Sequence, residues 1–148
     1  MTDITKNSLN ENVYLIKKRT VKTAKKQIRP IIENALVSEN QSDEENFQNG
    51  VLRPIIKLQH DLLLCFFEQY LKGRKMPFDD KNQGQKQQLI DALFNKDTSF
   101  KKTLITMVTA LFTVEEYLVY LPKNSEFNKR IKQMIKQKIS RAYNDQNE

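Results

Sequence analysis

Apolar residues recur at helical spacing along the last third of the chain, and this pattern limits the possible folds more than any other feature. After Pro122 they fall every three or four positions, which places them on one face of a helix. They are Phe127, Ile131, Met134, Ile135, Ile139 and Ala142. Three glycines and four prolines are few for 148 residues rich in helix formers. The sequence therefore predicts an all-α protein, a compact bundle of five to six helices.

Shifts in composition divide the chain into five segments. Residues 1–12 are a polar lead-in that we expect to be disordered, and residues 13–37 form a basic N-terminal helix that Pro30 kinks or restarts. Residues 38–46 hold four acids and no apolar residue, which indicates a linker and places acids ahead of the next helix. Residues 47–143 form the helical core domain, and residues 144–148 a frayed tail.

The core domain begins with a long central helix, expected from Phe47 to Leu71 and kinked at Pro54. A polar loop then leads to a short helix over 85–95 and to a helix capped by Asp97 or Ser99. Thr113 and the residues after it match a capping box, so a further short helix is predicted to follow.

The single cysteine, Cys65, excludes an internal disulfide framework. It lies in the longest apolar run, residues 62–67, and we expect a buried structural thiol. That run is far too short to span a membrane, and residues 1–6 show no apolar signal core. We therefore expect a cytoplasmic protein without a membrane span.

Basic residues gather in two places, on the N-terminal helix and on the last helix. The chain carries a net charge of +7, and a basic surface attracts nucleic acid, anionic lipid or acidic proteins. The residues predicted to contact a partner are Lys17, Lys18, Arg19, Lys22, Lys25, Lys26, Arg29, Lys129, Arg130, Lys132 and Lys136. A simply solvated polar face is the competing interpretation.

We favour a non-catalytic interaction module that docks a macromolecular partner through the basic N-terminal helix. Apolar anchors such as Val13 and Ile16 would make the contact, and the lysines would steer an acidic protein toward it. Sequence-independent nucleic-acid binding through the two lysine-rich helices is the alternative, and it lacks an aromatic stacking pattern. Self-association through the first helix is a further possibility.

Catalytic motifs are weak, so an enzyme of unknown type is the third hypothesis. His60 and Asp61 are adjacent, and adjacent helical residues point about 100° apart. Glu115 and Glu116 are explained by capping and by the helix dipole. There is no Glu-x-x-His motif and no glycine-rich phosphate loop, so we predict no metal and no cofactor.

Several stretches between Phe47 and Ile139 carry a family resemblance. They are residues 47–49, 51–55, 57–63, 112–117 and 128–131. In them the chain resembles an uncharacterised family of short all-helical bacterial proteins, some of which carry an automatic glyoxalase label. The resemblance implies an all-helical fold and no established activity. Metal-dependent glyoxalases need clustered His and Glu ligands, whereas this chain has one histidine, His60.

Overall fold

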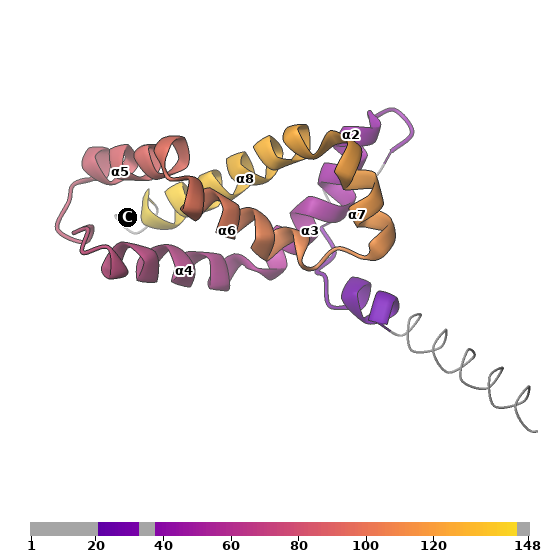
Figure 1. Cartoon of the computed structure of the whole chain (residues 1–148), viewed down its shortest axis with the longest axis horizontal. Coiled ribbons are helices and arrows are strands. Elements are labelled where there is room, and N and C mark those ends of the chain that lie inside the picture. Colours follow the sequence, from indigo (N-terminus) through magenta and orange to yellow (C-terminus); the bar gives the residue numbers. More distant parts are fainter. Residues whose placement is uncertain (1–20, 33–37, 145–148) are drawn as a thin grey trace, which may run out of the picture.

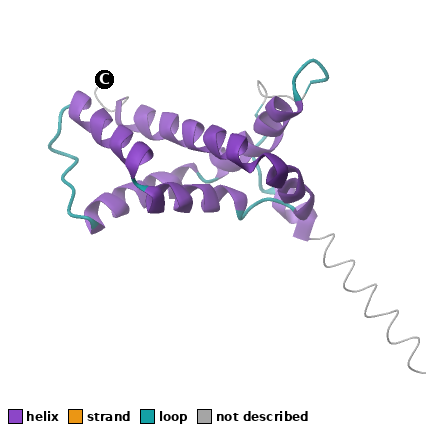
Figure 2. Cartoon of the chain, turned by 45° about the horizontal axis from the view of Figure 1, so that its top comes forward, coloured by secondary structure: helices purple, strands orange, loops and turns teal. Residues whose placement is uncertain are grey.

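The structure, a computed structural model, describes residues 21–32 and 38–144. Every regular element in this part of the chain is helical, which confirms the predicted all-α bundle (Figures 1 and 2). A helical stretch over residues 21–27 opens the N-terminal segment, the name used here for residues 21–32. The elements that follow are α2 (Asp43–Phe47), the π-helical turn η1 (Gln48–Leu52), α3 (Arg53–Leu58), α4 (His60–Gly73), α5 (Gln83–Lys96), α6 (Thr98–Thr109), α7 (Val114–Tyr120), the 3-10 turn η2 (Leu121–Lys123) and α8 (Asn124–Asn144).

The long helix expected from Phe47 begins four residues earlier and is interrupted twice. Ser42 caps α2, and the acids that follow it lie in the first turn, where the helix dipole favours them. Pro54 has no N–H to donate, and the π-helical turn just before it accommodates this loss, with the Arg53 N–H bonded to the Gln48 carbonyl. The predicted kink is thus a π-helical turn. A second bend lies at Gln59, between α3 and α4.

The core is organised around α8, which packs against α3, α4, α5 and α6 (Figure 1). Ile131, Ile135 and Ile139 on its inner face are fully buried, as the apolar spacing predicts. An aromatic cluster fills the space between α4, α5 and α6, with Phe100 in edge-on contact with Phe67 and Phe94. The sequence predicted that the helix over residues 47–71 is central, and in the structure α8 is central as well.

Side-chain caps fix where the shorter helices start. Asp97 caps α6 by accepting from the Phe100 N–H, and Thr113 opens α7 with the predicted capping box. A second capping box at Asn82 starts α5 two residues before the expected position. Because these bonds are local, the sequence locates most helix starts to within a few residues.

Cys65 corrects one prediction, because its side chain is exposed and not buried. The apolar run over residues 62–67 is wider than the buried face of α4. Leu63 and Phe67 point into the core, whereas Leu62 is 54% exposed and lies three residues from Cys65 on the outer face. No helix in the described part of the chain is long and apolar enough to cross a bilayer.

Candidate functional site

The turn between α6 and α7 is held by reciprocal hydrogen bonds. The Thr113 hydroxyl accepts from the Glu116 N–H at 3.3 Å, and the Glu116 carboxylate accepts from the Thr113 N–H at 2.8 Å. Both residues are buried, although both are polar. The capping box thus fixes a carboxylate at the N-terminus of α7, where the dipole favours a negative charge.

Arg29 in the N-terminal segment binds this carboxylate. Its two terminal nitrogens donate to the two Glu116 oxygens at 2.7 Å each, and one also donates to the Leu111 carbonyl at 3.0 Å. The two side chains are only 7% and 11% exposed. A bidentate pair in such a setting is stronger than a surface ion pair, so Arg29 anchors the N-terminal segment to the α6–α7 turn.

The pKa of Glu116 reflects this environment. Burial alone would raise it, because a buried carboxylate loses its hydration. The hydrogen bonds from Arg29 and from the Thr113 backbone outweigh burial and hold the pKa below its ordinary value. Glu116 is therefore ionised at neutral pH and is committed to structure.

Some of the predicted basic residues in the N-terminal segment bind other residues of the same chain. Lys22 donates to Glu115 at 2.8 Å, and Lys25 donates to the Phe112 carbonyl at 3.0 Å. Lys26 is exposed. Lys17, Lys18 and Arg19 lie outside the described residues, as do the proposed anchors Val13 and Ile16.

The predicted basic residues of α8 divide in the same way. Arg130 donates to Glu126 and to the Gln48 side chain, and Lys136 pairs with Asp91 at 2.9 Å. Lys129 is exposed and Lys132 half-buried, and neither has an ion pair with another described residue. The two clusters therefore do not form one continuous free basic face.

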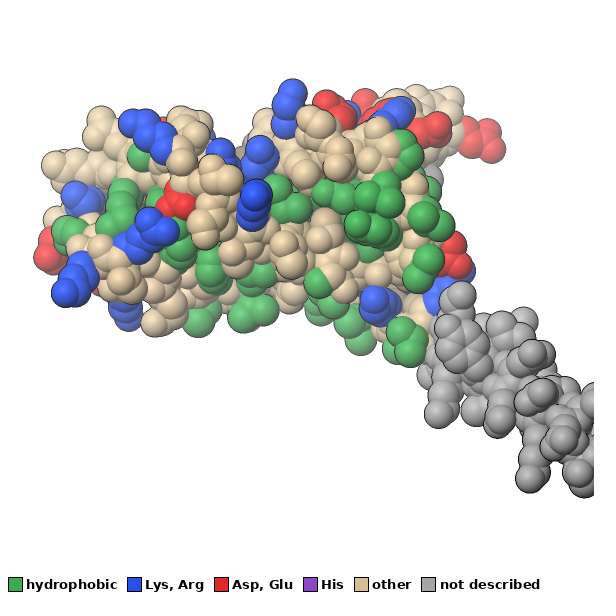
Figure 3. Space-filling model, viewed as in Figure 1, with side chains coloured by type: hydrophobic (Ala, Val, Ile, Leu, Met, Phe, Trp, Pro, Cys, Tyr) green, Lys and Arg blue, Asp and Glu red, His purple; other side chains and the backbone are tan. Residues whose placement is uncertain are grey.

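An apolar surface that the sequence interpretation did not identify lies on α7. The outer face of α7 carries Val114, Tyr117 and Leu118, exposed by 61%, 46% and 60%, and Leu121, the first residue of η2, continues it with an exposure of 41%. We call these four residues the α7 stripe. Figure 3 shows hydrophobic side chains gathered at the end of the molecule that carries α7. Exposed apolar residues at this spacing are typical of a helix that docks a partner.

The signal for the α7 stripe was present in the sequence. Its residues stand at positions i, i+3, i+4 and i+7. Periodicity alone assigns such a face to the core, but in α7 the buried residues are Glu116 and Tyr120. The inner face of α7 is thus partly polar because it receives Arg29, and the apolar face is left outside.

The two pairs of catalytic candidates lie on different helices, His60 and Asp61 on α4 and Glu115 and Glu116 on α7. His60 and Asp61 border an open hollow of about 370 Å³ with Lys57, Leu58 and Lys138. Glu115 and Glu116 are both engaged by the N-terminal segment. No group of three His, Cys, Asp or Glu residues in the described chain could hold a metal ion.

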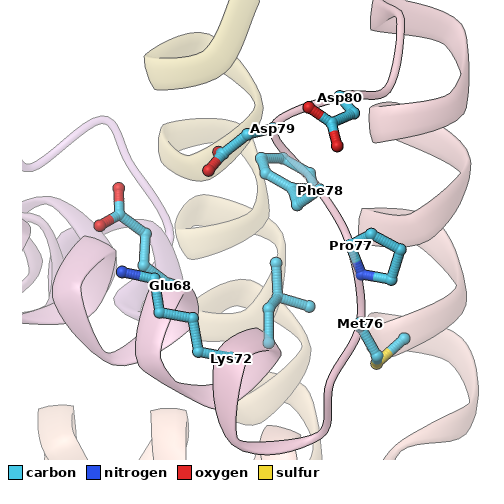
Figure 4. A pocket seen from close by; sticks show the side chains of 8 residues that line it. Glu68, Lys72, Met76, Pro77, Phe78, Asp79 and Asp80 are labelled. Atoms are coloured by element: carbon cyan, nitrogen blue, oxygen red, sulfur yellow. The ribbon is translucent and has the colours of Figure 1, made fainter.

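A second hollow, of about 440 Å³, lies between α4 and the loop that precedes α5. Figure 4 shows the residues that line it, with Glu68 and Lys72 on α4 at one side and residues 76–80 on the loop at the other. Glu68 accepts a hydrogen bond from the Tyr143 hydroxyl at 2.8 Å, and the Phe78 ring packs edge-on against that tyrosine. These contacts tie the loop to α8 and give the hollow a structural role.

Comparison with known proteins adds no assignment: no family model, no curated protein and no solved structure matches the chain. The family resemblance noted in the sequence therefore supplies no activity, and functional inference depends on the surfaces described above.

Proposed function

We propose that this chain is a non-catalytic interaction module that docks an amphipathic helix of a partner protein. The docking surface would be the α7 stripe together with the basic N-terminal helix, whose described part is bound to α7 through Lys22 and Arg29. The observation that carries the proposal is the solvent exposure of four large apolar side chains at helical spacing on α7 and on the first residue of η2. Leaving such a face in water is unfavourable, and a partner helix would bury it.

The positive charge of the N-terminal helix indicates that the partner helix carries acidic residues. Lys26 is exposed on the N-terminal segment, and Lys17, Lys18 and Arg19 precede that segment in the sequence. A partner helix with acidic residues along its edge would complement these side chains and would be steered toward them at low salt. Neutralising Lys17, Lys18 and Arg19 is expected to slow association more than it speeds dissociation.

The chain offers a matched pair of substitutions to test the docking surface. Leu118 on α7 and Leu62 on α4 are the same residue type, exposed by 60% and 54%. The partner is first identified by a photo-crosslinking residue placed at position 117, and its affinity for purified variants is then measured. We expect Leu118→Asp to weaken binding by at least about tenfold, as for a central apolar anchor. Leu62→Asp should leave affinity unchanged.

Equal losses in the two variants, or no loss in either, would overturn the proposal. Analytical ultracentrifugation of the purified chain tests a different occupant. A wild-type dimer that Leu118→Asp converts to a monomer would show that a second copy covers the α7 stripe. Circular dichroism of both variants checks that the helices remain intact.

A further inference from the structure

The open hollow between α3 and α8 has an unusual concentration of positive charge. Lys57 and Lys138 line it from opposite helices, together with Leu58, His60 and Asp61. The two helices pack directly against each other, so the two lysines project from one packed surface. Lys138 is half-buried, whereas Lys57 is exposed.

The charges at this hollow are not neutralised by ion pairs, in contrast to those of Arg130 and Lys136 on α8. Lys136 pairs with Asp91, and Arg130 with Glu126. Neither Lys57 nor Lys138 forms an ion pair with another described residue. Asp61 is the one acid among the residues that line the hollow, so positive charge is in excess there.

Two arginines add to this excess. Burial, and then repulsion from Lys57, Arg141 and Arg53, lowers the pKa of Lys138. Arg53 donates to the neutral Asn49 side chain at 2.9 Å, a bond that leaves its charge uncompensated. These like charges disfavour the charged form of Lys138, and a bound anion would relieve that repulsion.

We propose that the hollow between α3 and α8 binds the phosphate group of a phosphate-bearing ligand. Lys57 and Lys138 would contact the phosphate oxygens, and Arg53 and Arg141 would supply additional positive potential. The volume of about 370 Å³ admits a phosphate with part of the molecule attached to it. The site is independent of the α7 stripe, and its ligand is either a small phosphorylated molecule or a single phosphate of a nucleic-acid backbone.

The test follows backbone amide shifts by NMR while the full chain is titrated with inorganic phosphate, with adenosine monophosphate and with a short single-stranded oligonucleotide. Saturable shifts are expected at residues 57–61 and 137–139. Lys138→Gln should weaken binding about tenfold, the loss expected for one hydrogen bond to a charged group. Lys129→Gln is the matched control, because it removes the same charge from an exposed position on the same helix and should leave affinity within about twofold.

The probes also distinguish the two sources of phosphate. Tighter binding of adenosine monophosphate than of the oligonucleotide would identify a small ligand, and the reverse order, with loss in Lys138→Gln alone, would identify a backbone phosphate. The proposal is overturned if no probe shifts these amides at millimolar concentration and low salt. Equal weakening by Lys129→Gln and Lys138→Gln would overturn it as well, because that result indicates general surface attraction.

Thermal melting provides a readout that does not depend on the NMR assignment. Phosphate should raise the melting temperature of the wild-type chain and of Lys129→Gln, because it binds the folded state. The increase should be smaller in Lys138→Gln, because this variant binds phosphate about tenfold more weakly. Without ligand, the melting temperature of Lys138→Gln should be equal to or above that of the wild type. A marked loss of stability in Lys138→Gln without ligand would contradict the repulsion described above.

Discussion

The buried pair between Arg29 and Glu116 predicts a strong energetic coupling across 87 positions of sequence. We consider the variants Arg29→Met, Glu116→Gln and their combination. Methionine keeps much of the apolar stem of arginine, and glutamine can still accept the capping hydrogen bond from the Thr113 N–H. The double-mutant cycle therefore isolates the interaction of the two charges from the capping of α7.

The structure sets the size of the effect. Two charge-assisted hydrogen bonds of 2.7 Å join the side chains in a largely buried setting. Each is worth about 1 kcal/mol more than a neutral bond, so a coupling free energy of about 2 kcal/mol is expected. The loss of stability from either single substitution has an upper limit. When the N-terminal segment detaches, the charged group that remains, Glu116 or Arg29, returns to water.

Native-state hydrogen exchange measures this coupling where it acts. The Ile28 N–H donates to the Ala24 carbonyl at 3.2 Å, and its protection reports detachment of the N-terminal segment. A coupling of about 2 kcal/mol corresponds to a factor of about 30 in protection. Urea unfolding of the core should change much less, because most residues of the segment are exposed and it adds little to the buried core.

The exposed pair Lys22 and Glu115 is the control, since it joins the same two parts of the chain at 2.8 Å. Its cycle, made with Lys22→Gln and Glu115→Gln, should give a coupling near zero because solvent screens both charges. An Arg29–Glu116 coupling below about 0.5 kcal/mol, or one equal to that of the control pair, would show that the buried charges do not stabilise each other as their geometry implies.

Three further outcomes are expected. The pKa of Glu116 in the folded chain lies below its ordinary value of 4.5, so the stabilisation that the ionised carboxylate gives is complete above pH 4.5 and is lost as the pH falls further. The protection of the Ile28 N–H should therefore be insensitive to pH near neutrality and should decline below pH 4.5. An unchanged protection down to about pH 3 would contradict this. Cys65 should react with a thiol reagent as fast in the native chain as in urea, and strong native protection would show it buried. Phe100→Ala should lower the free energy of unfolding by about 3–5 kcal/mol in urea titrations, and a loss below about 1 kcal/mol would mean that the aromatic cluster is not a packed core.

Local chemistry explains why much of the fold could be predicted. The apolar spacing of α8 names the residues that the structure buries, and the Thr113 capping box marks the start of α7 to the residue. Each of these signals depends on side chains a few positions apart, within one helix. The kink at Pro54 was predictable for the same reason, although its form as a π-helical turn was not.

Contacts between residues far apart in the sequence could not be predicted from local sequence patterns. Sequence rules assign Glu116 to the capping box, which is correct, but they give no indication that Arg29 also binds it. The apolar run around Cys65 predicts a buried helix without saying which of its residues point outward. The candidate site was missed for a related reason, because an apolar stripe indicates a core face unless something shows that the opposite face is buried.

The Arg29–Glu116 pair and the α7 stripe lie on opposite faces of the same helix, and this connects the ion pair to the proposed docking. A bound carboxylate at the N-terminus of α7 turns the charged face of that short helix toward Arg29, and the apolar face is then left in solvent. The same contact holds the N-terminal segment at the α6–α7 turn, where α7 begins. If the partner binds both, then detaching the segment removes part of the docking surface, so Arg29→Met should weaken partner binding without altering any residue of the stripe. A partner that contacts the stripe alone would be indifferent to Arg29, and that comparison separates the two modes of docking.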